Sequence, residues 1–123
     1  MAVREVRGAT TVEHNEEEEI INATKELFEE VIKANCLDKE DLIDIIFTIT
    51  PDIDKLFPTK AVRQLGYTDV PLLDMAAPDI DGALKKCIRV IIHTNTEKKN
   101  SEMVPVYLRG AKVLRPDLVS KNV

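Results

Sequence analysis

The segment from Leu84 to Ile92 most constrains the fold, because it is a short apolar run interrupted by a charged side chain. Its β-branched residues are typical of a β-strand. Side chains alternate between the two faces of a strand, so Arg89 points away from Ile88 and Val90. A guanidinium cannot lose its charge and is costly to bury unpaired. Arg89 must therefore reach water, a carboxylate or an anionic ligand, and the strand alone leaves all three open.

The composition indicates a single aliphatic domain. The chain of 123 residues has room for one compact domain. Since 44% of its residues are hydrophobic but only 4% are aromatic, we expect a mostly aliphatic core. The net charge of −5 argues against a general nucleic-acid-binding role. No apolar run approaches the roughly 20 residues that span a bilayer, and no signal peptide is evident, so we expect a cytoplasmic protein without membrane contacts.

The cysteines and histidines are not spaced as metal ligands or as a redox pair. Cys36 and Cys87 are far apart in the sequence, and so are His14 and His93. We therefore expect two reduced thiols, of which at least Cys87 is packed, and no metal site.

One long helix, one short helix and about five strands make up the expected elements. The long helix begins at Asn15, which with Glu18 resembles a capping box, and ends at Asn35. The short helix is expected from Thr59 to Leu65, with Pro58 suited to its first position and Gly66 closing it. The strands are expected at residues 2–9, 43–50, 70–75, 84–92 and 104–108.

These elements predict an α/β fold of the α+β type, a mixed sheet with helices on one face. The other face carries residues such as Ile91, so we expect oligomerisation to bury it. Residues 1–118 are expected to form the one domain, and residues 119–123 a mobile tail.

Polar side chains on strand faces and loop edges form a set that suits a small anion. The set consists of Arg7, Lys60, Arg63, Asp74, Arg89, Tyr107 and Arg115. Arginine binds planar carboxylates in a bidentate manner, so the set predicts a receptor for a dianion that carries a hydroxyl. No nucleophile–base pair, paired carboxylates or Gly-rich phosphate loop accompanies it. An enzyme built on this set would work by positioning and fixed charge.

Several motifs spread over nearly the whole chain form a pattern with nearly constant spacing. They lie at residues 6–13, 50–52, 57–63, 70–72, 85–90, 106–108 and 114–118. The pattern resembles the small monofunctional chorismate mutases of the AroH type. The resemblance implies a homotrimer shaped as a pseudo-α/β barrel, with active sites in clefts between subunits. It also implies the rearrangement of chorismate to prephenate in phenylalanine and tyrosine biosynthesis, with no cofactor.

The resemblance implies a role for each site residue. Arg89 is expected to face the ether oxygen of chorismate and to touch the side-chain carboxylate, which Arg7 and Tyr107 hold. Phe57 and Leu114 are expected to wall the ring. The other binding positions are Lys60, Arg63 and Arg115 at the mouth, and Leu73, Met75, Ala76 and Ala77 along the ring. One group of these residues consists of Arg7, Arg89 and Tyr107, and a second consists of Phe57, Lys60 and Arg63. We expect the two groups to come from neighbouring chains.

The sequence departs from the family at one acidic position. Ala77 stands where better-known members have a glutamate that holds the substrate hydroxyl, and Asp74 stands where they have a small residue. Because one carboxylate is lost and another gained in the same segment, we hypothesise that Asp74 takes the catalytic role of the glutamate. Asp79 is the competing candidate.

Two other functions remain open from the sequence. One is a non-catalytic or regulatory trimer that binds a small dicarboxylate, which fits the missing glutamate. The presence of Arg7, Arg89 and Tyr107 favours the enzyme instead. The other is a trimer of related fold that deaminates enamines or imines, and no positive motif supports it.

Overall fold

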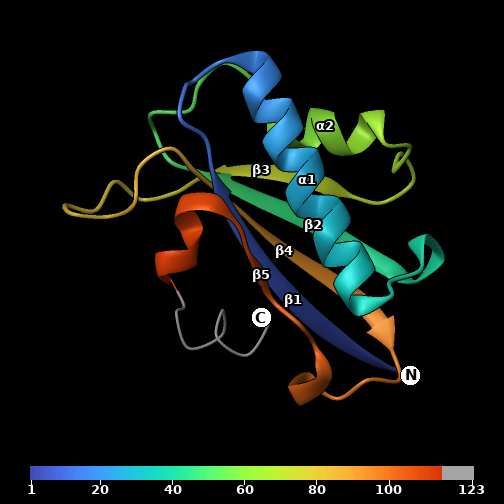
Figure 1. The fold of residues 1–123 in the computed structure, drawn as a ribbon. Coiled ribbons are helices and arrows are strands. Elements are labelled where there is room, and N and C mark those ends of the chain that lie inside the picture. Colours follow the sequence, from blue (N-terminus) through green and yellow to red (C-terminus); the bar gives the residue numbers. More distant parts are fainter. Residues whose placement is uncertain (115–123) are drawn as a thin grey trace.

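A mixed five-stranded sheet is the framework of the protein, and the computed structural model describes residues 1–114 (Figure 1). The strand order is β3-β2-β4-β1-β5. β4 is antiparallel to β1 and β2, whereas β3 is parallel to β2 and β5 is parallel to β1. The predicted mixed sheet of about five strands is confirmed. The strands are β1 (Ala2–Thr11), β2 (Leu42–Ile49), β3 (Leu72–Ala76), β4 (Cys87–Thr96) and β5 (Val106–Tyr107).

The boundaries of β4 differ from the prediction. The strand begins at Cys87 rather than Leu84, because the preceding Lys86 has a φ of 47° and turns the chain. It continues past Ile92 to Thr96 because β1 pairs with it along its whole length. Pairing with a neighbouring strand, and not the local apolar run, therefore decides where β4 ends.

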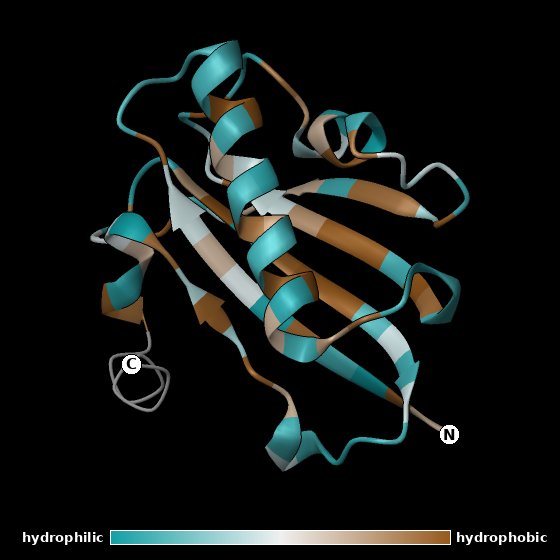
Figure 2. Cartoon of the chain, turned by 45° about the vertical axis from the view of Figure 1, so that its right-hand side comes forward, coloured by the Kyte–Doolittle hydropathy of each residue, from teal (hydrophilic) through white to brown (hydrophobic). Residues whose placement is uncertain are grey.

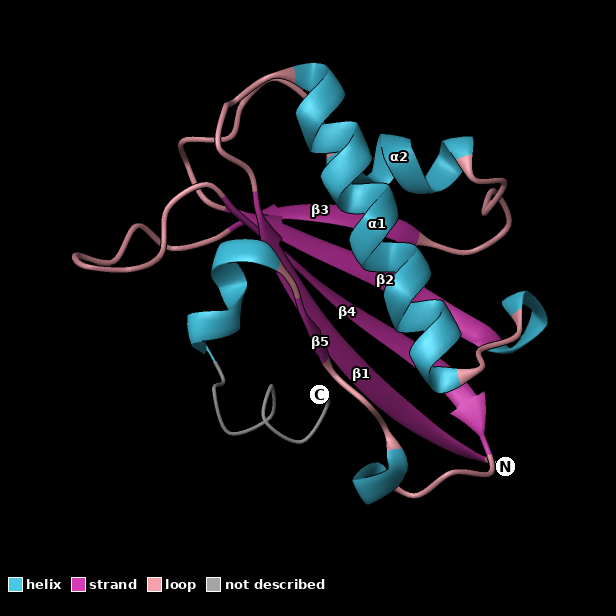
Figure 3. Ribbon diagram, in the orientation of Figure 1, coloured by secondary structure: helices cyan, strands magenta, loops and turns pink. Residues whose placement is uncertain are grey.

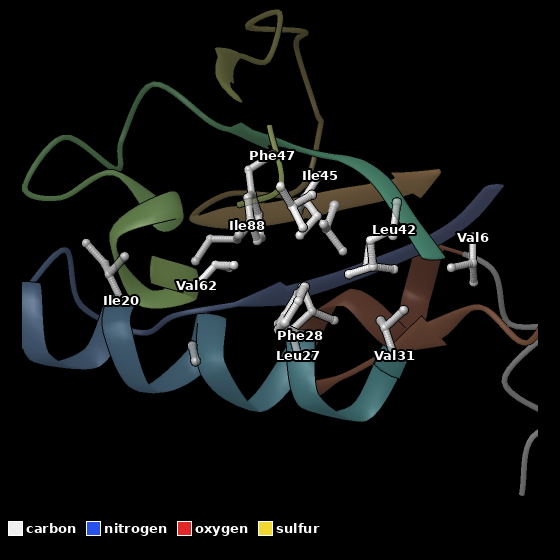
Figure 4. Close-up of a cluster of buried hydrophobic side chains, with 14 of the residues drawn as sticks. Val6, Ile20, Leu27, Phe28, Val31, Leu42, Ile45, Phe47, Val62 and Ile88 are labelled. Carbon is white, nitrogen blue, oxygen red and sulfur yellow. The ribbon is translucent and has the colours of Figure 1, made fainter. Parts of the chain in front are cut away.

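Helix α1 (Glu17–Asn35) lies across one face of the sheet, with α2 (Pro58–Gln64) beside it near β3 (Figure 3). The outward side of α1 is hydrophilic (Figure 2). Its inward side packs on residues of β1, β2 and β4 to form the main core (Figure 4). The α1 residues in this core recur at helical spacing, namely Ile20, Ala23, Leu27, Phe28 and Val31.

The start of α1 is not capped as the sequence predicted. The N-cap residue is Glu16, whose side chain makes no capping hydrogen bond. The Glu19 carboxylate accepts the backbone N–H of His14 at 3.2 Å instead. The side chain of Asn15 donates to Asp54 Oδ1 at 2.6 Å and accepts the Asp54 N–H at 3.1 Å. Asn15 therefore joins the start of α1 to the loop before α2.

Short 3₁₀ segments complete the described chain. They are η1 (Lys39–Asp41), η2 (Asn100–Glu102) and η3 (Arg109–Leu114). The side chain of Asp38 caps η1 by accepting the Glu40 N–H at 3.2 Å. The tail predicted at residues 119–123 lies outside the described residues. No helix in the described range has the length and apolar content needed to cross a membrane.

Candidate active site

Arg89 lies on the face of the sheet that α1 leaves uncovered. Its neighbours Ile88 and Val90 are buried under the helices, whereas Arg89 is exposed. The predicted alternation of this strand is therefore confirmed. The same face carries Leu73 and Met75 on β3, each about half exposed.

A hollow of about 190 Å³ brings four of the predicted site residues together on this face. It is lined by Arg7, Gly8, Ala9, Arg89, Val90, Tyr107 and Leu114. The strand register explains the grouping, because Ala9 pairs with Arg89 on one side and with Tyr107 on the other. Arg7 pairs with Ile91 and is therefore a diagonal neighbour of Arg89, and such neighbours are typically about 7–8 Å apart.

Two glycines beside this hollow allow neighbouring elements to pack closely against β1. A Cβ on Gly8 would lie 3.0 Å from side-chain atoms of Leu27 and Val31, so glycine lets α1 approach β1 next to Arg7. A Cβ on Gly110 would lie 2.8 Å from Thr11 Oγ1, which accepts the Gly110 N–H at 3.0 Å. Segment η3 is thereby held against β1, and it carries Leu114 to the hollow.

The hollow has an excess of positive charge. Within residues 1–114, the ion pairs involve neither Arg7 nor Arg89. No aspartate or glutamate is among the lining residues. Two nearby guanidinium groups on a partly apolar wall repel each other, and a bound carboxylate would relieve that repulsion. The geometry therefore suits an anionic ligand.

Cys87 lies on the same face as Arg89 but is not suited to act as a nucleophile. Its side chain is 1% exposed and packs with Ala9 and Ala111. Burial raises the pKa of the Cys87 thiol, and the Arg89 guanidinium opposes this rise without cancelling it. The thiol therefore stays protonated near neutral pH. Both cysteines are free, as predicted, and no cluster of potential ligands in the described range is arranged to hold a metal ion.

The second predicted group of residues lies at the other edge of the sheet. Phe57 precedes α2, which packs near β3, and its side chain is 66% exposed. Lys60 and Arg63 on α2 are also exposed. β2 and β4 separate β3 from β1, which corresponds to about 14 Å at the usual strand spacing. One chain therefore does not bring these three residues to the hollow.

The remaining predicted positions accompany this second group. Leu73, Met75 and Ala76 lie on β3, and the Ala77 N–H donates to the Ile49 carbonyl at 2.8 Å just beyond it. Arg115 lies outside the described residues.

Asp74 lies beside α2 and not in the hollow. It pairs with Phe47, whose side chain is in the main core, so Asp74 faces the helices. Its Oδ1 accepts the Thr59 N–H at 3.2 Å, and its Oδ2 accepts the Thr59 hydroxyl at 2.5 Å. Sequence reasoning did not include Thr59, because the two residues are 15 positions apart and meet only through the packing of α2 near β3. Asp79 lines a separate hollow of about 510 Å³.

Asp52 belongs to the motif at residues 50–52, but no site role was predicted for it. Its carboxylate accepts the Lys86 N–H at 3.0 and 3.1 Å and the Thr50 hydroxyl at 2.5 Å. Thr50 Oγ1 in turn accepts the Cys87 N–H at 3.0 Å. These bonds fix the backbone at the start of β4, just before Arg89. The Thr-Pro-Asp turn after β2 was the available signal, since such side chains often bond nearby backbone.

The titration of Asp52 leads to a pH-dependent prediction. Burial raises the pKa of this carboxyl, but hydrogen bonds from Thr50 and Lys86 outweigh it, so the pKa lies below its usual value. Such a group stabilises the fold above its unfolded-state pKa of about 3.9 and loses that effect as the pH falls through the folded-state pKa. We expect Asp52→Asn to lower the free energy of unfolding near neutral pH, by an amount that shrinks below about pH 4.

Urea unfolding at fixed protein concentration from pH 7 to pH 3 measures this difference. Asp69→Asn is the control, because Asp69 is exposed and accepts no hydrogen bond from the described residues. A destabilisation by Asp52→Asn that is the same at every pH would contradict the prediction.

Known proteins resemble this chain over nearly its whole length. Residues 3–118 match the family described as chorismate mutase type I. The chain is 45% identical over 124 residues to chorismate mutase AroH of Bacillus subtilis (strain 168), covering 99% of this chain and 98% of that protein. It is 43% identical over 119 residues to chorismate mutase AroH of Thermus thermophilus, covering 96% and 98%.

A solved structure supports the same relationship. A chorismate mutase from Clostridium thermocellum superposes with a TM-score of 0.88 at 45% identity, covering 89% of this chain and 98% of that one. At this identity and coverage the likeness extends to sequence as well as fold. As the sequence motifs predicted, this chain belongs to the chorismate mutase type I family.

Proposed function

We propose that this protein is a chorismate mutase, which converts chorismate to prephenate in the synthesis of phenylalanine and tyrosine. The observation that carries the proposal is the hollow in which Arg7, Arg89 and Tyr107 converge. Membership of the chorismate mutase type I family supports it. We infer that residues 1–118 form the catalytic domain and that the protein works in the cytoplasm.

The reaction requires positioning and fixed charge rather than a nucleophile. In this Claisen rearrangement an ether C–O bond breaks while a C–C bond forms within one molecule, and no proton is transferred. The protein must hold the folded conformer and stabilise negative charge on the ether oxygen. Arg89 donates to that oxygen and to the side-chain carboxylate, which Arg7 and Tyr107 also bind. Leu114 packs against the ring.

We infer that a neighbouring subunit completes the site in a homotrimer of the pseudo-α/β-barrel type. Phe57, Lys60 and Arg63 are exposed, and in one chain they lie at the sheet edge away from the hollow. Apolar side chains on the uncovered sheet face support burial by other copies, since Leu73 and Met75 are 52% and 50% exposed. In the trimer, Phe57 packs on the ring, and Lys60 and Arg63 bind the ring carboxylate. The other proposed contacts come from Leu73, Met75, Ala76, Ala77 and Arg115.

We assign to Asp74 the catalytic role of the glutamate absent at Ala77. Its carboxylate lies beside the first turn of α2, close to the segment that carries Phe57 and Arg63. There it would hold the substrate hydroxyl and balance positive charge that develops on the ring. Asp79 is the competing candidate.

The mass of the native protein tests the trimer. One chain is 13.8 kDa, so a trimer has about 41 kDa by light scattering or sedimentation equilibrium at assay concentration. A mass near that of one chain in fully active protein would contradict the shared site.

Loss of chorismate absorbance with the purified protein tests the reaction, with prephenate identified by its acid-catalysed conversion to phenylpyruvate. We expect multiple turnovers without an added cofactor. Binding of chorismate without conversion would support a non-catalytic dicarboxylate-binding protein instead.

A further inference from the structure

Three polar side chains form a cluster where α2 meets β3. Thr59, which is 3% exposed, donates its N–H to one oxygen of the Asp74 carboxylate and its hydroxyl to the other. Arg63, one turn further along α2, donates Nη1 to Thr59 Oγ1 at 3.4 Å. The hydrogen bonds thus run in one direction, from Arg63 through Thr59 to Asp74.

This arrangement fixes the orientation of the carboxylate. A carboxylate held through one oxygen still turns about that bond, whereas donors to both oxygens restrict the rotation of the whole group. Hydrogen bonds to a charged acceptor are stronger than those between neutral groups. Because Thr59 Oγ1 accepts from Arg63, its own proton is directed toward Asp74 Oδ2, and the two bonds reinforce each other.

The position of α2 does not depend on this pair alone. Ala61 and Val62 of α2 are fully buried, and Val62 belongs to the main core. The helix is therefore anchored by apolar packing. The specific effect of the Thr59 donors is on the direction of the Asp74 carboxylate, which is only half-buried.

We propose that Thr59 is a positioning residue for the reaction, acting by holding the Asp74 carboxylate in its productive orientation. The inference rests on the proposed function, in which Asp74 touches the substrate. It goes beyond that function because it adds Thr59, which does not itself touch the substrate, and predicts that the two residues act as one unit.

Three single variants test the proposal through chorismate kinetics. Thr59→Val keeps the shape but removes the hydroxyl, and we expect kcat to fall about tenfold to a hundredfold with a smaller change in KM, as for loss of one hydrogen bond to a charged group. Thr59→Ser keeps both donors and should retain kcat within about threefold. Thr24→Val is the control, because Thr24 is fully buried and its hydroxyl has no partner in residues 1–114.

A double variant separates positioning from a structural effect. In the Asp74→Ala background, Thr59→Val should change kcat less than about twofold, because the group it orients is absent. Thermal unfolding of each variant accompanies the kinetics. Full activity of Thr59→Val, or an equal loss with and without Asp74, would overturn the proposal. An unaltered protein that does not convert chorismate would refute the proposed function itself, and this inference with it.

Discussion

Arg89→Ala is expected to lower kcat for chorismate by at least about 10²–10³-fold, the loss typical of removing one preorganised donor to a developing oxyanion. The loss should exceed this range because the donor is charged. Arg89 lies in the hollow with Arg7 and Tyr107 and has no carboxylate partner in the described range, so its charge is available to a bound anion. Water entering the space left by the side chain would not replace an oriented cation.

Two further variants show whether the effect is specific. Arg89→Lys keeps the charge but not the planar donor geometry, and we expect it to remain strongly impaired. Arg4→Ala is the matched control, because Arg4 lies on β1 on the helix side of the sheet and donates to the Lys98 carbonyl at 3.1 Å. Retention of activity within about threefold in Arg89→Ala would contradict its role at the ether oxygen.

Asn35→Ala is expected to reduce the free energy of unfolding by about 3 kcal/mol, since a buried side chain loses three hydrogen bonds, two of them to the partly buried backbone of Val104. Asn35 is 1% exposed, and its Nδ2 donates to the carbonyls of Val31 at 3.0 Å and Val104 at 2.9 Å. Its Oδ1 accepts the Val104 N–H at 2.7 Å. The side chain thus joins the end of α1 to the segment before β5, which carries Tyr107.

Urea unfolding monitored by circular dichroism measures this loss at a fixed protein concentration. Asn22→Ala is the control, because Asn22 lies on the exposed side of the same helix and its removal should change stability by less than about 0.5 kcal/mol. Similar changes in the two variants would contradict a structural role for the buried amide.

The part of the candidate site on the uncovered sheet face could be predicted from the sequence, because the alternation of side chains along β4 is a local pattern. Alternation along one strand was enough to place Arg89 opposite Ile88 and Val90. The family motifs then placed Arg7 and Tyr107 with it, and the described hollow contains all three. The main core could also be predicted from the sequence, since the apolar residues of α1 recur at helical spacing.

The contacts that the sequence did not reveal join distant segments through side chains. Asn15 is of a residue type that often caps helices, but its hydrogen-bond partner Asp54 is 39 residues away. Asn35 was interpreted as a helix end, whereas its amide is paired with Val104, 69 residues away. The bond from Thr59 to Asp74 belongs to the same class, because no periodicity in either segment indicates the other.

The central claim is that two neighbouring chains build one chorismate mutase site, and mixing inactive subunits tests it most directly. Arg89→Ala removes one half of the proposed site, and the Lys60→Ala/Arg63→Ala double variant removes the other. Each is assayed alone and after unfolding and refolding together in equal amounts. In mixed trimers some sites receive both intact halves, and random assembly predicts recovery of about a quarter of the unaltered kcat. A mixture no more active than the average of its two components would contradict the account and place the whole site within one chain.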